Sequence, residues 1–201
     1  MCPNRERKTM NFQIKPAVPA DGQAIGDLMQ EIWAEMAHKE WYVPDDGPHV
    51  TALLEEGKAI AFLALAETDG GEAGSGEAGA AGEAPAAEAG GVLAGAFLAV
   101  LPGRSEENLG REYGLSEGEL DLAAHMDSVA VRKAFRGFGL QHRLMEVTEE
   151  ALAAKGIRYL FCTAHPENTY SQNNIRSLGY EAFLQKDMYG GYRRDLFIKC
   201  I

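Results

Sequence analysis

The stretch Asp127–Gln141, DSVAVRKAFRGFGLQ, decides the interpretation of this sequence. An apolar run, SVAV, leads directly into a basic turn with two glycines, and an amphipathic helix is expected to follow. The first N–H groups of a helix are unpaired and carry partial positive charge, so they bind phosphate well. Gly137 and Gly139 lack the Cβ that would keep a phosphate from the backbone, and Arg132 and Arg136 add charge. The stretch therefore predicts an anion site at a strand–turn–helix junction, although the same glycines also suit an ordinary tight turn.

Other phosphate-binding and hydrolytic motifs fit this chain poorly. A dinucleotide fingerprint needs a third glycine where His142 stands, and no acidic residue ends a strand about 20 residues further on. The sequence has no G-K-[ST] loop, no H-E-x-x-H and no glycosidase-type carboxylate pair. A nucleotide- or nicotinamide-binding domain is thus disfavoured.

Hydrophobic periodicity extends outward from this motif in both directions. The predicted order is β, α, α, β, β, α, β, α, β, α, β, β, which indicates an α/β or α+β domain around a mixed sheet. The main markers are a helix carrying Ile25 to Met36, strands at 59–66, 92–101, 125–131 and 159–163, helices at 140–154 and 166–178, and a last strand through Leu196, Ile198 and Cys200. We predict one domain over 10–201, preceded by a flexible extension at 1–9.

A tract of unusual composition lies between two of the predicted strands. Asp69–Gly91 holds 23 residues, of which 8 are Gly, 8 Ala and 5 acidic. Such a segment buries too little apolar surface to offset the entropy of ordering, so a disordered loop is expected. The apolar runs on either side predict a β-hairpin whose turn has been expanded, and loop closure costs little more as a loop lengthens.

Charge and cysteine content exclude several classes of protein. With 30 acidic and 19 basic residues the formal charge is −11, which argues against a nucleic-acid partner. Nothing approaches the roughly 20 apolar residues of a membrane span, and the N-terminus has no signal-peptide pattern, so we expect a cytoplasmic protein. Three widely spaced cysteines predict neither disulfides nor a metal site.

Two motifs together resemble the Gcn5-related N-acetyltransferase (GNAT) family. The run V-A-V-x-x-x-F-R-G-x-G-L from Val129 to Leu140 is similar to the family's motif A, and HPENTYSQNNIRSLGY at His165–Tyr180 resembles its motif B. The resemblance extends over about 10–201. It implies a mixed, mostly antiparallel sheet flanked by helices, with splayed strands at the cofactor site.

The resemblance also implies binding of acetyl-CoA. The backbone of Val129, Ala130 and Val131 would pair with the pantetheine arm, and one N–H would polarise the thioester carbonyl. Asn168 would lie near the pantetheine or acetyl group. The diphosphate would be held by the turn and the first residues of the helix, namely Arg136, Gly137, Phe138, Gly139, Leu140 and Gln141.

The sequence departs from the family pattern at two positions. Gln141 replaces a small residue, so its side chain must point away from the cofactor. Ile175 stands where the family often has a tyrosine that protonates the leaving thiolate, and isoleucine donates no proton. The substitutes are Ser171 on the same helix face, or Tyr170, Tyr189 and Tyr192, with departure of an unprotonated thiolate an open alternative.

The base that deprotonates an amine commonly lies two or four residues before V-A-V in this family. Those residues are Asp127 and His125, which strand alternation places on one face. A structural hydrogen-bonded pair is the alternative. Glu67 is a further candidate for binding the acceptor. Trp33, Trp41 and Tyr42 are candidates to line its pocket, unless they belong to the core.

We therefore expect direct transfer of an acetyl group from acetyl-CoA to a primary amine of a small molecule or peptide. The partners are acetyl-CoA and an amine acceptor, with no metal, no membrane and no nucleic acid, and a homodimer is possible. The alternative is a non-catalytic acetyl-CoA sensor of the same fold, which Ile175 would favour. Residues 104–124 are expected to cover the acceptor pocket.

Overall fold

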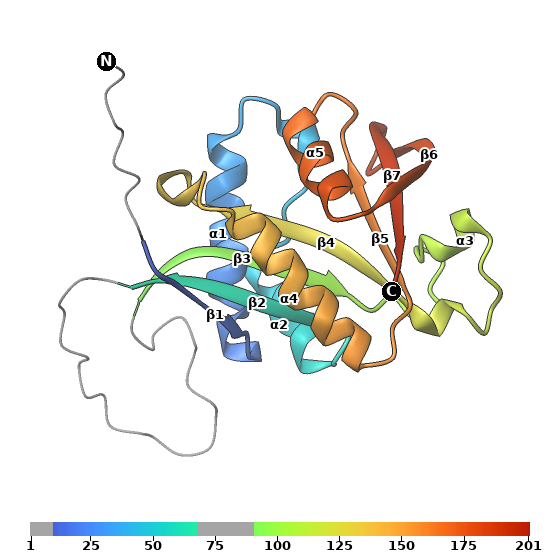
Figure 1. Ribbon diagram of the computed structural model, residues 1–201, viewed down its shortest axis with the longest axis horizontal. Helices are drawn as coiled ribbons and strands as arrows, with labels where there is room; N and C mark the ends of the chain where they lie inside the picture. The colour runs from blue at the N-terminus through green and yellow to red at the C-terminus, as the bar shows by residue number, and fades with distance from the viewer. Residues whose placement is uncertain (1–9, 68–90) are drawn as a thin grey trace.

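The computed structural model describes residues 10–67 and 91–201, which form one seven-stranded sheet with helices on both faces (Figure 1). The predicted extension at 1–9 and nearly all of the predicted 69–91 loop lie outside the described residues. The elements in chain order are β1 (Phe12–Pro16), α1 (Gly22–Glu35), α2 (Gly47–Glu55), β2 (Ala59–Ala66), β3 (Val92–Val100), α3 (Gly110–Tyr113), β4 (Ala123–Val131), α4 (Leu140–Ala154), β5 (Tyr159–Ala164), α5 (Thr169–Ser177), β6 (Glu181–Met188) and β7 (Tyr192–Cys200).

The strand order in the sheet is β1-β2-β3-β4-β5-β7-β6. Every neighbouring pair is antiparallel except β4 and β5, which are parallel and joined through α4. The predicted mixed, mostly antiparallel α/β fold is confirmed, and β2 and β3 pair as the hairpin that the sequence indicates.

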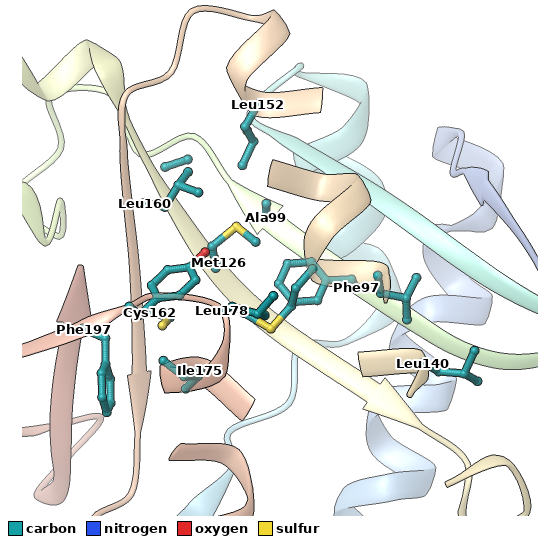
Figure 2. Close-up of a cluster of buried hydrophobic side chains, with 14 of the residues drawn as sticks. Phe97, Ala99, Met126, Leu140, Leu152, Leu160, Cys162, Ile175, Leu178 and Phe197 are labelled. Carbon is teal, nitrogen blue, oxygen red and sulfur yellow. The ribbon is translucent and has the colours of Figure 1, made fainter. Parts of the chain in front are cut away.

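Apolar side chains fill both sides of this sheet. One cluster packs α1 and α2 on one face, and includes Ile25, Leu28, Met29 and Val50. A larger cluster packs α4 and α5 on the opposite face (Figure 2), where Phe97, Met126 and Leu160 meet Leu140 and Ile175. Burying one such large side chain fully contributes about 1.5–3 kcal/mol, so these clusters hold the helices against the sheet.

The parallel pair β4–β5 separates shortly after it begins. Backbone pairing covers Ala123–His125 against Tyr159–Phe161 and then stops, while both strands continue. Beyond this point β4 stays paired on its other side with β3, out to Val131. One edge of β4 therefore faces the gap between the strands, as the resemblance implies.

A register shift in β3–β4 lies at the start of this gap. Leu98 pairs with Ser128 and the next residue, Ala99, pairs with Met126, so Asp127 is an extra residue on β4. A bulge of this kind bends the strand and redirects side chains. Before the bulge Met126 packs toward α4, and after it Val129 does so, because the alternation has shifted by one residue.

Helices α1 and α2 meet through glycines. A Cβ on Gly26 would lie 2.2 Å from the backbone nitrogen of Gly47, the first residue of α2. Only hydrogen at position 26 permits this backbone approach. The contact fixes the end of the α1–α2 loop, whose residues reach the cleft described below.

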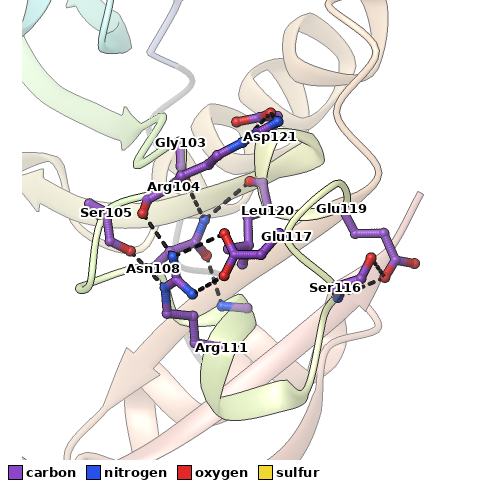
Figure 3. A network of polar contacts seen from close by, with 11 residues as sticks. Gly103, Arg104, Ser105, Asn108, Arg111, Ser116, Glu117, Glu119, Leu120 and Asp121 are labelled. Atoms are coloured by element: carbon purple, nitrogen blue, oxygen red, sulfur yellow. Dashed lines mark hydrogen bonds and ion pairs between the residues drawn. The ribbon is translucent and has the colours of Figure 1, made fainter.

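The segment between β3 and β4 forms its own polar network (Figure 3). Asn108 donates to the carbonyls of Gly103 and Leu120, and Arg111 pairs with Glu117. Tyr113 packs against Phe161 and Phe183, at the side of the sheet where β5, β6 and β7 lie (Figure 1). No residue of this segment lines the cavity in the described part of the chain, so the expected cover over the acceptor pocket is not found.

Candidate active site

A cavity of about 950 Å³ opens where β4 and β5 part. Its walls come from the end of α1 and the following loop, from β4 and β5, and from the N-terminal parts of α4 and α5. The residues used below that line it are Trp41, Tyr42, Asp127, Val129, Val131, Arg136, Gly137, Gly139, Leu140, Gln141, Cys162, Thr163, Asn168, Tyr170, Ser171, Asn174 and Ile175.

The glycine turn forms one end of this cavity. Gly137 and Gly139 have φ of 86° and 72°, a left-handed conformation that disfavours side chains, and a Cβ on either would meet no protein atom within 4 Å. The first intrahelical bond of α4 is from Arg143 N to Gly139 O. The amides of residues 140–142 therefore precede the helical ladder and are available to an anion.

The two arginines of the turn have different environments. Arg132 makes an ion pair with Glu31 of α1, with Nη2 2.9 Å from Oε2, and also donates to Leu93 O. Arg136 donates from Nε to Val131 O at 3.2 Å and lines the cavity. Arg136 is thus the better placed of the two to meet a ligand.

Four other predicted cofactor residues lie around the turn and strand. Val129 and Val131 line the cavity, whereas the Ala130 side chain is buried on the α1–α2 face. Phe138 is absent from the lining and packs on Phe12, with ring centroids 5.5 Å apart. Ala130 can contribute only its backbone to the cavity, and Phe138 supports the turn from behind.

Helix α5 forms the opposite wall. Asn168 caps it by accepting from Ser171 N at 3.1 Å, and both residues line the cavity. The Gln141 side chain accepts from Asn174 Nδ2 at 2.9 Å, so it is tied to α5 rather than left free over the glycine turn. Ile175 is only 4 % exposed and belongs to the core between α5 and the sheet.

Asp127 lies at the bulge, in contact with the solvent of the cavity. Its Oδ2 accepts from Ser128 Oγ at 3.0 Å, and its carboxyl group is a hydrogen-bonding neighbour of the Asp45 carboxyl from the α1–α2 loop. Desolvation by the surrounding cavity walls, followed by the nearby charge of Asp45, raises the pKa of Asp127 to about 6. A carboxylate with this pKa is suited to accept a proton near neutral pH.

His125 is placed differently from Asp127. Its Nε2 accepts from Leu109 N at 3.0 Å, so the ring is capped by the β3–β4 segment, and it does not line the cavity. Burial lowers the pKa of His125 to about 4, which keeps the imidazole neutral. The structure therefore brings Asp127, but not His125, together with Ser171 and the cofactor-binding candidates.

Residues of the α1–α2 loop and the β6–β7 turn complete the site. Of the predicted aromatic residues, Trp41 and Tyr42 line the cavity, and neither Trp41 Nε1 nor the Tyr42 hydroxyl has solvent contact or a well-formed hydrogen bond. Tyr189, at the β6–β7 turn, lies near Thr163 and Asp127 and is 48 % exposed. Arg194 is 2 % exposed and donates to Glu40 O at 2.8 Å, which joins β7 to the loop.

Asp45 is a neighbour of Asp127 that the sequence analysis did not single out. It stands in WYVPDDGPH at residues 41–49, where two adjacent aspartates follow an aromatic pair. Only one of the two is needed as a helix cap, and Asp46 has that role, accepting from His49 N at 2.9 Å. Asp45 therefore has no capping role, and this second aspartate is the feature of the sequence that could have drawn attention to the loop.

Comparison with known proteins agrees with this architecture. Residues 23–180 match the sequence profile described as the acetyltransferase (GNAT) family. The chain belongs to this family. The family assignment made from the two motifs is thereby confirmed, while the individual site residues stay predictions. A search of curated proteins found no match.

Solved structures of GNAT acetyltransferases share the fold at low sequence identity. Arabidopsis thaliana NAA60 in complex with acetyl-CoA has a TM-score of 0.68 and 10 % identity, over 95 % of this chain and 99 % of that one. The putative acetyltransferase yncA from Salmonella typhimurium, with its cofactor acetyl-CoA, has a TM-score of 0.60 and 15 % identity, over 94 % and 93 %. Ribosomal-protein-S5-alanine acetyltransferase from Vibrio fischeri has a TM-score of 0.60 and 12 % identity, over 96 % and 95 %.

Two further observations bear on the chemistry of this GNAT protein. Among residues 10–67 and 91–201 there is no group of three or more His, Cys, Asp or Glu side chains arranged to hold a metal ion. In the same residues no helix is both long and apolar enough to span a membrane.

Proposed function

We propose that this GNAT acetyltransferase uses acetyl-CoA and transfers the acetyl group directly to a primary amine of a small molecule or peptide. The observation that carries the proposal is the single cavity that joins the glycine turn, the free edge of β4 and the carboxylate of Asp127. One ligand can therefore reach a site for a diphosphate, a strand edge that pairs with the pantetheine arm, and a base.

The residues present fit acetyl-CoA. Left-handed glycines at 137 and 139 leave open space in front of the α4 amides, which suits a diphosphate, and Arg136 supplies charge. The edge of β4 at Val129–Val131 has no β5 partner, so its backbone groups can pair with the pantetheine amides as an added strand. Asn168 and Ser171 face the same cavity from α5.

The reaction needs no covalent enzyme intermediate. Asp127 takes a proton from the acceptor ammonium, and the resulting amine attacks the thioester carbonyl, so that a C–N bond forms as the C–S bond breaks. The second proton that the nitrogen loses passes to the departing thiolate or to solvent. Cys162 lines the cavity, but burial raises the pKa of its thiol and keeps it protonated, which makes it a poor nucleophile. Proximity of the two substrates supplies much of the rate.

The leaving thiolate has several possible proton donors. Ile175 provides none, whereas the hydroxyls of Ser171 and Tyr170 line the cavity and Tyr189 lies beside Thr163. CoA thiolate also leaves without protonation. The acetyltransferase from Vibrio fischeri is named for an alanine of ribosomal protein S5, which supports including peptide amines among the acceptors.

The alternative function is an acetyl-CoA sensor without transfer activity. Ile175 favours it, because a core side chain occupies the position of the family's usual acid. The two functions differ in one measurement. Both predict that acetyl-CoA raises the melting temperature, but only the enzyme releases CoA thiol when primary amines are added.

A glycine pair provides the matched test of cofactor binding. Gly139 and Gly156 precede and follow α4, have φ of 72° and 85°, and have no atom within 4 Å of a built Cβ. Alanine at either position costs about 1–2 kcal/mol of backbone strain. We expect equal losses of stability, with CoA binding weakened at least tenfold in Gly139→Ala alone. Equal CoA affinity in the two variants would contradict the assigned diphosphate site.

A further inference from the structure

The cavity has an apolar end at the point where β4 and β5 come together. Ala124 and Leu160 form the last β4–β5 pair whose side chains belong to the cluster on the α4–α5 face. The next side chains on this face are Met126 on β4 and Cys162 on β5, which no longer pair across the gap. Both of them line the cavity. The cavity therefore extends to the junction of the two strands.

Three further apolar side chains surround this junction. Phe97 of β3 and Ile175 of α5 line the cavity and belong to the same cluster as Met126 and Cys162 (Figure 2). Met145 of α4 does so as well. Each of these five side chains is only 2–5 % exposed, so the cavity penetrates between the sheet and the two helices. We call the space between these five residues the apex pocket.

The chemistry of the apex pocket suits an alkyl group. The side chains of phenylalanine, methionine, isoleucine and cysteine contain no oxygen or nitrogen that could hold a water molecule. A buried water needs polar partners, whereas an apolar cavity takes up apolar groups instead. Met126 and Met145 are flexible, so the pocket can adjust to the shape of a short chain.

The apex pocket is closed behind Met126 and Cys162. Leu152 of α4 and Leu160 of β5 belong to the same cluster (Figure 2). Both are fully buried, and neither lines the cavity. An alkyl group that enters the pocket therefore meets packed core after a short distance.

The direction of a bound CoA places its acyl group at this end. The diphosphate site at Gly137 and Gly139 lies beyond the last residue of β4, and the pantetheine arm is expected along the edge at 129–131. The arm therefore runs along β4 toward lower residue numbers, and Met126 lies further in this direction. The aromatic wall for the acceptor is on the other side, since Tyr42 packs with the cluster on the α1–α2 face. The acyl group thus has a pocket separate from that of the amine.

We infer that the apex pocket binds the alkyl chain of an acyl-CoA longer than acetyl-CoA, with propionyl-CoA and butyryl-CoA as the substrates that fit. This inference rests on the proposed transfer reaction and adds to it the class of acyl group that is transferred. The bond between the amine nitrogen and the acyl carbon forms as the bond between that carbon and sulfur breaks. Asp127 takes one proton from the nitrogen, and the departing thiolate or solvent takes the other. The alkyl chain itself does not react.

Isothermal titration calorimetry with a series of acyl-CoAs tests the pocket without catalysis. One methylene moved from water into an apolar site favours binding about fourfold. The Kd should therefore fall about fourfold from acetyl-CoA to propionyl-CoA, and again to butyryl-CoA. Octanoyl-CoA should bind more weakly than butyryl-CoA, because the pocket is closed. A Kd that is lowest for acetyl-CoA, or that does not change with chain length, would overturn the inference.

Two methionine substitutions on β5 test whether the apex pocket is where the chain binds. Cys162→Met adds bulk inside the pocket, whereas Leu160→Met places the same side chain on the same face of β5 at a position that does not line the cavity. The ratio of the Kd for acetyl-CoA to the Kd for butyryl-CoA should fall at least fourfold in Cys162→Met and stay at the parent value in Leu160→Met. An unchanged ratio in Cys162→Met would contradict the inference. If Cys162→Met does not fold, the series of acyl-CoAs with the parent protein still decides.

Release of CoA thiol separates this inference from the transfer reaction. If butyryl-CoA binds more tightly than acetyl-CoA while no amine releases thiol from either, the apex pocket stands and the transfer reaction fails. If butylamine releases thiol from acetyl-CoA but propionyl-CoA and butyryl-CoA bind more weakly than acetyl-CoA, the inference fails and the transfer reaction stands.

Discussion

The substitution Gly26→Ala tests whether the packing of α1 on α2 sets the geometry of the acceptor site. The new Cβ would lie 2.2 Å from Gly47 N and 2.5 Å from Gly47 Cα, whereas ordinary contact begins at 3.4 Å. The helices must therefore separate by about 1.2 Å at this point, because neither partner atom belongs to a flexible side chain. Gly47 is the residue after the Asp46 cap, so the displacement reaches Asp45 directly.

Two opposing effects determine the sign of the stability change. Alanine gains about 1 kcal/mol over glycine inside a helix. Overpacking in a tight contact costs about 1–3 kcal/mol, and more where backbone has to move. Since the overlap here is with backbone, we expect a net loss of about 2 kcal/mol in the free energy of unfolding. For a chain of this size that loss lowers the melting temperature by about 4–8 °C.

The substitution should weaken binding of the amine acceptor and leave binding of acetyl-CoA unchanged. The atoms nearest to a Cβ on Gly26 belong to Asp46 and Gly47 and not to the glycine turn, so the affinity for acetyl-CoA should stay within twofold. The KM for an amine acceptor such as butylamine should rise several-fold, because the loop that brings Trp41 and Tyr42 to the cavity has moved. Gly118→Ala is the control, since its Cβ would meet nothing within 4 Å and its φ is not left-handed. If the Gly26→Ala protein is as stable as the parent protein and its kinetics with butylamine are unchanged, this reasoning is refuted.

Two further outcomes follow from contacts of the same fold. Replacing Arg194 by leucine removes the hydrogen bond to Glu40 O. Steady-state kinetics should then show a higher KM for the acceptor and an unchanged KM for acetyl-CoA. Equal effects on the two KM values would contradict a role of Arg194 in holding the α1–α2 loop. The pKa of His125 is about 4 in the folded chain and about 6.5 in the unfolded chain. As the pH falls from 6.5 to 4, the unfolded chain binds a proton that the folded chain does not bind. The folded state therefore loses stability over this range. Urea unfolding of the parent and of His125→Asn should therefore give a stability difference that shrinks over this pH window, and a constant difference would argue against a neutral, buried imidazole.

Much of the fold could be predicted from the sequence because its signals are local. The helix stripe predicted through Leu140, Leu144, Val147, Ala151 and Ala154 is a property of neighbouring residues, and the structure contains the helix and buries Leu140 and Leu144. Toward its C-terminal end the buried face passes instead through Thr148 and Leu152. The order of twelve helices and strands is also the predicted one. Two helices differ from the prediction. The helix expected after a capping box at Ser116 is absent, since α3 lies at Gly110–Tyr113 and Leu120–Leu122 form only a 3-10 turn. The helix expected from 166 begins at Thr169, because Asn168 serves as its cap.

The relation of His125 to Asp127 could not be predicted in the same way. Strand alternation places them on one face, but alternation says nothing about what covers that face. The bulge at Asp127 directs one carboxylate toward the cavity, while the β3–β4 segment supplies Leu109 N to His125. Both features depend on pairing between strands and on a segment that the sequence suggested would lie over the acceptor pocket.

The acceptor site is the part of the molecule least accessible from sequence, and the reason is physical. Its contacts join residues far apart in the chain: Arg194 binds Glu40 O, and Asp45 meets Asp127. An aspartate in a loop has no periodic pattern to mark its direction, since a loop repeats neither every 2 nor every 3.6 residues. What marks Asp45 is instead its effect on Asp127, because a second carboxyl beside a desolvated carboxylate raises the pKa of that carboxylate. The glycine turn that defines the family is visible in the sequence because it is local, whereas the proton affinity of Asp127 depends on a loop that pairing of distant segments brings beside it.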